Sequence, residues 1–191
     1  MTEKQKLSIP AQYHQLDEQL ARASYCFKLY QNIELDTSPI PDAELAAFKK
    51  KFYELAQAEK VILSQTLLIQ IHKFFDKHHK AIHLIDLVNS CEANPEYNGI
   101  EQLYRNLLTE HNDTINKLRN KVYAHTDAYQ YPEEHFENIK LTYTDLKEII
   151  ETMELLMSKI AQSLKLSRIP NIKAEKVQNQ HREMILKVAE G

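Results

Sequence analysis

Glycine is scarce in this 191-residue chain, which contains only Gly99 and Gly191. Average usage of about 7% would give roughly a dozen glycines in a chain of this length. Hairpins and tight strand turns use glycine for positive φ angles, so two glycines argue against a β-rich fold. The same scarcity excludes a Gly-rich phosphate loop, and with it the P-loop and dinucleotide-binding classes.

Cysteine and long apolar runs are also scarce. Cys26 and Cys91 cannot form a disulfide framework, and both fit the role of small buried residues in a reducing compartment. The first ten residues lack the apolar core of a signal peptide. The longest near-apolar run, 61–71, is too short and too polar to span a bilayer. We therefore expect a cytoplasmic protein without a membrane partner.

The charge balance excludes a generically basic nucleic-acid binder, because the net charge is −3. Any nucleic-acid site must be a local patch. The hydrophobic fraction of 43% and the charged fraction of 27% are ordinary for a globular protein, and the length suits one domain with at most an appendage.

Apolar residues recur at steps of three and four, and prolines separate the resulting segments. Helices are predicted from about residue 10 for some 24 residues, and then over 43–75, 81–92, 100–125 and 144–164. The second is long enough to suggest a break near Ala58. A weaker helix is predicted from Pro170 to about Val188. The pattern predicts an all-α, up-and-down helical bundle of four to five main helices over residues 1–166, with a C-terminal helical arm at 167–191.

One predicted helix carries two arginine–histidine pairs with the same spacing. Arg105 precedes His111 by six residues, and Arg119 precedes His125 by six, so the two copies share one helix face two heptads apart. Mid-helix His111 is expected to face the bundle, held by a hydrogen bond, with Arg105 solvated beside it. His125 is the last residue of the apolar stripe, and three cations occupy positions 117–121. Cations at a helix end also complement the helix dipole, so an ordinary polar helix end remains open.

The second copy lies in the stretch RNKVYAHTD, residues 119–127, which resembles the signature of the HEPN superfamily. HEPN proteins are small α-helical bundles with an arginine, a polar residue and then a histidine after a few positions. The wording RNK–AH–D resembles the abortive-infection AbiU-like branch, and residues 62–89 agree with that branch. The resemblance extends in helix order over roughly Tyr13–Leu164, so the C-terminal helix lies outside it.

The resemblance implies a metal-independent endoribonuclease of the toxin or host-defence type, with no cofactor, RNA as ligand, and a homodimer as the working form. Arg119 and His125 would be catalytic. Histidine exchanges protons near neutral pH, and arginine matches two phosphate oxygens. The resemblance also makes an antitoxin or a defence protein a possible partner. In one HEPN subgroup a tyrosine two residues after the histidine is modified by an antitoxin. Asp127 occupies that position here, so this regulation is not expected.

Five further residues are candidates for supporting or RNA-binding roles. Asn120 would position Arg119 or donate a hydrogen bond to phosphate, Lys121 adds positive charge, and Tyr123 could stack on a base. Asp127 is the last residue of the RNK–AH–D motif, and the resemblance suggests that Asp76 faces the same cleft.

Two other functions remain open. The first is a catalytically silent RNA-binding or protein-interaction adaptor that uses its C-terminal helix. The second is a metal-dependent helical-bundle hydrolase that uses the cluster from His72 to His83, where His72–Asp76 and His79–His83 have i, i+4 spacing. The simpler interpretation of that cluster is a solvated connector in which Asp76 caps the short helix.

Overall fold

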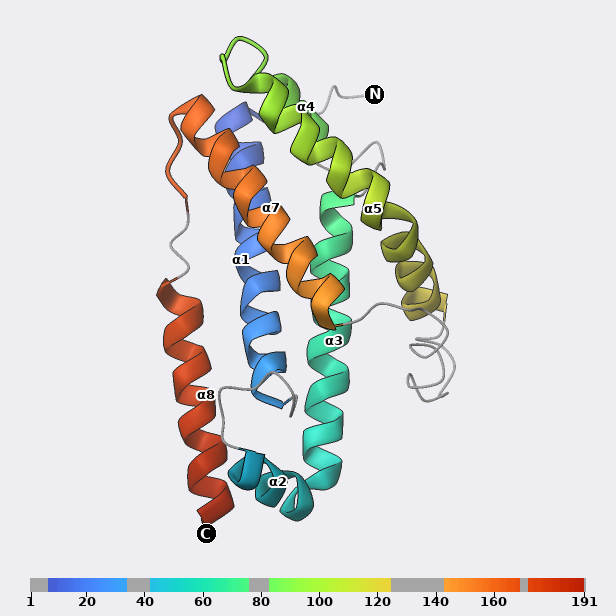
Figure 1. Cartoon of the computed structure of the whole chain (residues 1–191), viewed down its shortest axis with the longest axis vertical. Coiled ribbons are helices and arrows are strands. Elements are labelled where there is room, and N and C mark those ends of the chain that lie inside the picture. The colour runs from blue at the N-terminus through green and yellow to red at the C-terminus, as the bar shows by residue number, and fades with distance from the viewer. Residues whose placement is uncertain (1–6, 34–41, 76–82, 125–142, 169–171, 191) are drawn as a thin grey trace.

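The computed structural model describes residues 7–33, 42–75, 83–124, 143–168 and 172–190, and every element in them is a helix. For residues 112–124 the description covers the backbone path alone. The predicted all-α bundle is therefore confirmed (Figure 1). The elements are α1 (Ile9–Ile33), α2 (Asp42–Lys51), α3 (Tyr53–Phe75), α4 (Leu84–Asn89), α5 (Tyr97–Ala124), α7 (Tyr143–Leu164) and α8 (Ile172–Glu190).

The helix α1 forms the spine of the bundle, and its sequence explains why. Pro10 occupies the first turn, where its missing N–H costs nothing, and the Ser8 carbonyl accepts the amide of Gln12 at 2.9 Å. The stripe predicted from the sequence is buried almost completely, from Tyr13 through Ala23 to Phe27. These side chains face α3 on one side and α7 on the other. α1 therefore supplies the contact surface on which both of these helices pack.

Most of the buried side chains form one core between α1, α3, α5 and α7. Figure 1 shows α1 and α3 running along the length of the molecule, with α7 crossing over them and α5 beside α3. Leu67 and Ile71 from α3, Leu107 from α5 and Met153 from α7 have at most 1% of their surface exposed. This core fixes α5, the helix that contains Arg105, His111 and Arg119, against α3 and α7.

The expected break in the long second helix occurs at Phe52 and not near Ala58, which lies inside α3. Backbone hydrogen bonds continue on both sides of the break, from Phe52 to Phe48 at 2.8 Å and from Ala56 to Phe52 at 2.9 Å. Tertiary packing explains the position of the break. The turn directs α2 toward α8, where a second apolar cluster forms from Ile33, Leu45, Phe48, Ala56 and Ile185.

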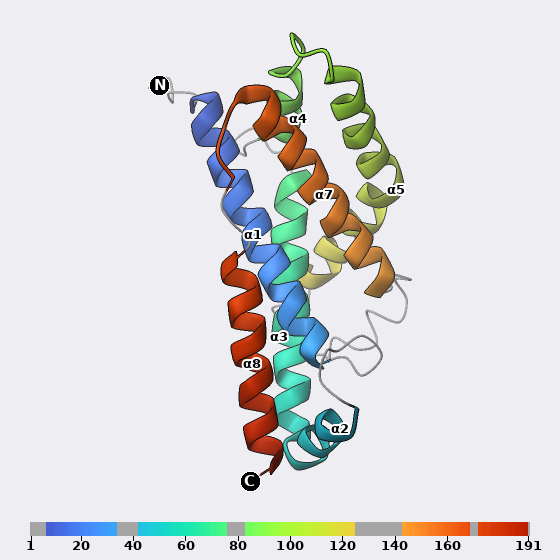
Figure 2. The same ribbon diagram turned by 60° about the vertical axis from the view of Figure 1, so that its left-hand side comes forward.

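The C-terminal helix α8 lies along α1 and meets α2 at the end of the molecule away from α4, as both views show (Figures 1 and 2). Its residues His181 and Ile185 are buried. The predicted division of the chain into a bundle at 1–166 and a C-terminal arm at 167–191 stays a prediction. In this structure, however, α8 packs on the bundle along one face.

The short helix α4 is smaller than the sequence pattern predicted. It covers six residues, and the chain between it and α5 forms turns. The N-cap of α4 is His83, in extended conformation and without a side-chain cap, so the interpretation of Asp76 as the capping residue is wrong. Cys91 is buried just after α4 and Cys26 is half-buried in α1, and both are free thiols as expected.

The end of α7 adopts a left-handed turn that normally uses glycine. Lys165 has a φ of 54°, the only positive φ among the described non-glycine residues. The amide of Lys165 bonds to the carbonyl of Gln162 at 3.3 Å, and that of Leu166 to Ala161 at 2.8 Å. These two bonds define a Schellman motif, which turns the chain back toward α1. Three residues later Arg168 reaches Asp17.

None of the helices in the described ranges combines the length and the apolar character that crossing a membrane requires.

Candidate functional site

The predicted catalytic segment lies at the C-terminal end of α5. The backbone is helical through Ala124, so Arg119, Asn120, Lys121 and Tyr123 lie within the last two turns of this helix, as the sequence predicted. Their side chains lie outside the described part of the structure. His125, Asp127 and Asp76 lie outside the described residues altogether. The roles assigned to all seven residues therefore stay predictions.

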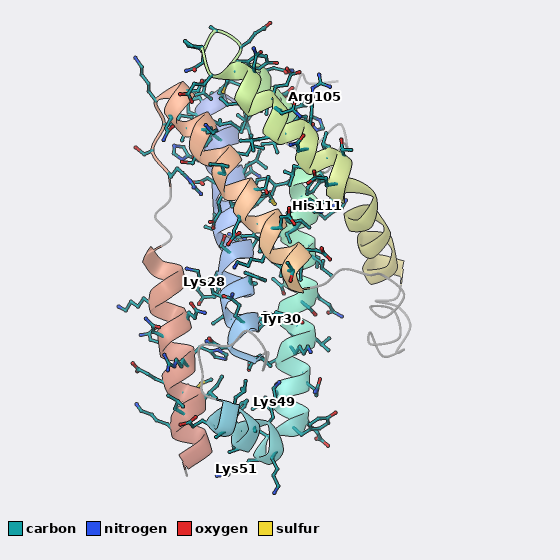
Figure 3. The ribbon with its side chains drawn as sticks, in the orientation of Figure 1. Lys28, Tyr30, Lys49, Lys51, Arg105 and His111 are labelled. Atoms are coloured by element: carbon teal, nitrogen blue, oxygen red, sulfur yellow. The ribbon has the colours of Figure 1, made fainter. Side chains whose placement is uncertain are left out.

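The upstream copy of the pair is described in full, and its arginine is an ordinary surface residue (Figure 3). The Arg105 side chain is 67% exposed and binds Glu101, one turn earlier, through Nε at 3.1 Å and Nη2 at 2.6 Å. The hydrogen bond to Glu101 and the charge of that carboxylate raise the pKa of Arg105 above its usual value. A neighbour on the same helix therefore neutralises Arg105, which fits the solvated role that its position predicted.

His111 is placed differently, at the contact between α5 and α7. Its side chain is only 12% exposed, and its Nε2 lies 3.8 Å from a carboxylate oxygen of Glu110. Glu148, from the first half of α7, brings a second carboxylate, and one ligand atom of each of the three residues lies within 4.8 Å of the others. The sequence correctly predicted that His111 faces the bundle. The groups beside it are the carboxylates of Glu110 and Glu148. Nothing in the local sequence pattern pointed to Glu148.

The predicted metal cluster from His72 to His83 is only partly within the described residues. His72 is buried in α3, with 5% of its surface exposed, and His83 is the N-cap of α4. Asp76, His78 and His79 lie outside. In the part of the chain that the structure describes, no group of potential metal ligands includes His72 or His83.

A buried polar network joins α1 to the chain segment after α7, and the sequence pattern did not predict it. Asp17 is 1% exposed, and Arg168 donates to it from Nε at 3.2 Å and to the backbone carbonyl of Glu154 from Nη1 at 3.2 Å. Tyr13 donates to the carbonyl of Met157 at 3.4 Å. Burial, followed by the negative charge of Asp17, raises the pKa of Tyr13 to about 12. Asp17 lies four residues after Tyr13 and therefore on the same helix face, which was the one signal available.

A second network holds α8 in place. Asn32, fully buried at the end of α1, donates from Nδ2 to the carbonyl of Gln178 at 3.0 Å and contacts Nδ1 of His181 at 3.1 Å. Because an amide nitrogen can only donate, Nδ1 of His181 accepts, and the imidazole proton belongs on Nε2. That nitrogen lies 2.7 Å from a carboxylate oxygen of Glu59 on α3. His181 of α8 thus lies against polar side chains of both α1 and α3.

Comparison with known proteins adds what the geometry alone does not. Searches of the curated proteins and of the solved structures return no significant match. The family model HEPN_AbiU2, described as AbiU2, matches residues 7–171. The match covers α1 to α7 and includes the stretch RNKVYAHTD, and it ends before α8. Because it spans most of the chain, this protein belongs to the AbiU2 family of HEPN proteins.

Proposed function

We propose that this protein is a metal-independent endoribonuclease of the abortive-infection type that cleaves RNA in the cytoplasm. The observation that carries the proposal is the family match over residues 7–171, within which RNKVYAHTD provides the arginine and histidine of the HEPN signature. The helical backbone through Ala124 agrees with a site at the end of a long helix.

The proposed reaction is an attack by the RNA 2′-hydroxyl on the adjacent phosphate. A base removes the 2′ proton, the 2′ oxygen bonds to phosphorus, and the 5′ oxygen leaves with a proton from an acid. The products are a 2′,3′-cyclic phosphate and a 5′-hydroxyl. His125 exchanges the protons, since an imidazole titrates near neutral pH. Such acid–base catalysis typically contributes about 10²–10⁴-fold. Arg119 stabilises the charge on the phosphorane.

Helix geometry supports a site shared by two chains. If the helix continued through residue 125, Arg119 and His125 would lie about 120° apart around its axis and about 9 Å apart along it. One straight helix cannot direct both side chains at one phosphate. A two-fold dimer that brings two such helices together would pool both pairs in one cleft, so that Arg119 of one chain acts with His125 of its partner.

The activity test uses total RNA and purified protein in EDTA. We compare the wild type with Arg119→Ala and His125→Ala. Arg105→Ala and His14→Ala are matched controls, because both replace exposed side chains elsewhere in the bundle. We expect the wild type and both controls to cleave RNA and leave cyclic-phosphate ends. Arg119→Ala and His125→Ala should be inactive. A wild type that is inactive in every buffer would favour the adaptor function. Activity lost in EDTA and restored by zinc or manganese would favour the metal-dependent hydrolase.

Mixing the two inactive variants tests whether the site is composite. Subunits of Arg119→Ala and His125→Ala are unfolded together and refolded, so that mixed dimers form. Recovered cleavage in the mixture, with none in either variant alone, is expected for a site built from both chains. No recovery, despite exchange of subunits shown by differently tagged chains, would place each site within one chain.

A further inference from the structure

We propose that His111, Glu110 and Glu148 bind a divalent transition metal, with zinc the best match, and that this metal ties α5 to α7. The proposal does not depend on ribonuclease activity. Its basis is the convergence of one imidazole and two carboxylates from two helices, with ligand atoms within 4.8 Å of one another.

The first argument is electrostatic. Two carboxylates directed at the same point repel each other unless a cation lies between them. The two cations nearest to them in sequence among the described side chains are already paired on their own helices: Arg105 with Glu101 at 2.6 Å, and Lys147 with Glu151 at 3.8 Å. A bound dication would convert the repulsion into attraction.

The second argument is the surroundings of the histidine. The His111 side chain is 12% exposed at a helix–helix contact, whereas that of Glu110 is 57% exposed. A mostly buried imidazole provides a fixed ligand, and the exposed carboxylates can adjust around it. This combination leaves one side of the group open to solvent, where a metal ion can enter and where water completes its coordination.

The third argument is distance and ligand type. Zinc bonds to nitrogen and oxygen at about 2.0–2.2 Å, so neighbouring ligands of a tetrahedral site lie about 3.3–3.6 Å apart. His111 Nε2 and Glu110 Oε2 are 3.8 Å apart and the three ligand atoms lie within 4.8 Å of one another, so a bound metal would draw the exposed glutamate side chains inward. An imidazole ligand favours zinc and its transition-metal neighbours over magnesium or calcium, which prefer oxygen alone.

The position on α5 indicates what such a metal would do. His111 precedes Arg119 by eight residues, which is about 12 Å along a helix. The metal would therefore lie too far from Arg119 to share its chemistry. It would instead fix the direction in which the end of α5 leaves α7. Cleavage in EDTA, as proposed above, is compatible with this bracing role.

The test is calorimetric titration of zinc into the metal-free full-length chain, with thermal unfolding in parallel. We expect one zinc per chain and a higher melting temperature with zinc. His111→Ala and Glu148→Gln should each weaken binding by about tenfold or more. Glu151→Gln, one turn away on α7, and His83→Ala, from the other histidine cluster, should bind as the wild type does. Cobalt should give the absorption spectrum of a nitrogen- and oxygen-ligated ion in the wild type and in these two controls, but not in His111→Ala or Glu148→Gln.

Three results would overturn the proposal: no binding at a large molar excess of zinc, wild-type affinity in Glu148→Gln, or binding that is lost in His83→Ala but kept in His111→Ala. Because Glu148 is exposed, its isosteric replacement should leave the fold intact. Glu148→Gln therefore decides the question even if His111→Ala does not fold.

Discussion

Replacing Arg168 by methionine should destabilise the fold by about 2–3 kcal/mol, because it removes the cation that faces a buried carboxylate. Methionine keeps much of the apolar stem of arginine and removes the charge. The lost contacts are the bond to Asp17 at 3.2 Å and the bond to the carbonyl of Glu154 at 3.2 Å.

The magnitude follows from the burial of the two partners. Removing one partner of a fully buried ion pair costs about 3–5 kcal/mol. Asp17 is 1% exposed, but the Arg168 side chain is 28% exposed and partly hydrated, and Asp17 keeps other contacts. Both facts lower the cost. The lost bond to the carbonyl adds about 1 kcal/mol. For a chain of this length, the sum corresponds to a fall of about 5–10 °C in melting temperature.

Urea and thermal unfolding followed by circular dichroism would measure the effect. Arg22→Met is the matched control, since Arg22 pairs with Glu18 at 2.6 Å but both side chains are more than half exposed. That variant should lose less than about 0.5 kcal/mol. Asp17→Asn in the Arg168→Met background should recover part of the loss. The reasoning is refuted if the Arg168 and Arg22 variants lose the same free energy, or if Arg168→Met and Asp17→Asn are additive.

Four other substitutions follow from the structure. Lys165→Gly should raise the free energy of unfolding by about 1 kcal/mol, because glycine relieves the left-handed φ of 54°; an unchanged urea midpoint would contradict this. Burial raises the pKa of Tyr13 from 10.0 to about 12, so its contribution of roughly 3 kcal/mol should be complete below pH 10 and disappear as pH rises to about 12. Tyr13→Phe should abolish this part of the alkaline dependence, and a profile like that of the wild type would refute the assignment. Ile185→Ala should cost about 2–4 kcal/mol, whereas Met184→Ala, at a position 51% exposed, should cost less than about 0.5 kcal/mol; equal losses would mean that α8 does not pack as described. Gly99→Ala should stabilise α5 by up to about 1 kcal/mol, since an added Cβ meets nothing within 4 Å; thermal unfolding with a lower midpoint would count against it.

The helical architecture was predictable because each main helix buries one face. In α1 the stripe through Tyr13, Leu20 and Phe27 repeats at helical spacing, and α7 repeats its own stripe through Met153 and Ile160. The break at Phe52 was not predictable, because both flanking segments are good helix formers. Its position depends on where α8 covers α2, which local sequence does not encode.

The candidate site, like the fold, was predictable from the sequence only in part. The resemblance to the family signature predicted Arg119 and His125 from the chain alone, and their roles stay predictions. No motif in the sequence indicated the contacts between distant segments. Glu148 approaches His111 only because α7 packs on α5, and Arg168 reaches Asp17 only because of the turn at Lys165. Such pairings are set by tertiary packing, which periodicity does not reveal.

The second apolar cluster has a consequence for how this family can vary. Ile185 of α8 covers Leu45 and Phe48, which are at most 3% exposed, although the family match ends at residue 171. In a relative whose chain stops near that point, the counterparts of Leu45 and Phe48 would face water. Polar residues at those two positions should therefore accompany the loss of α8. A segment missing from the end of a gene would then be detectable in substitutions more than a hundred residues before it.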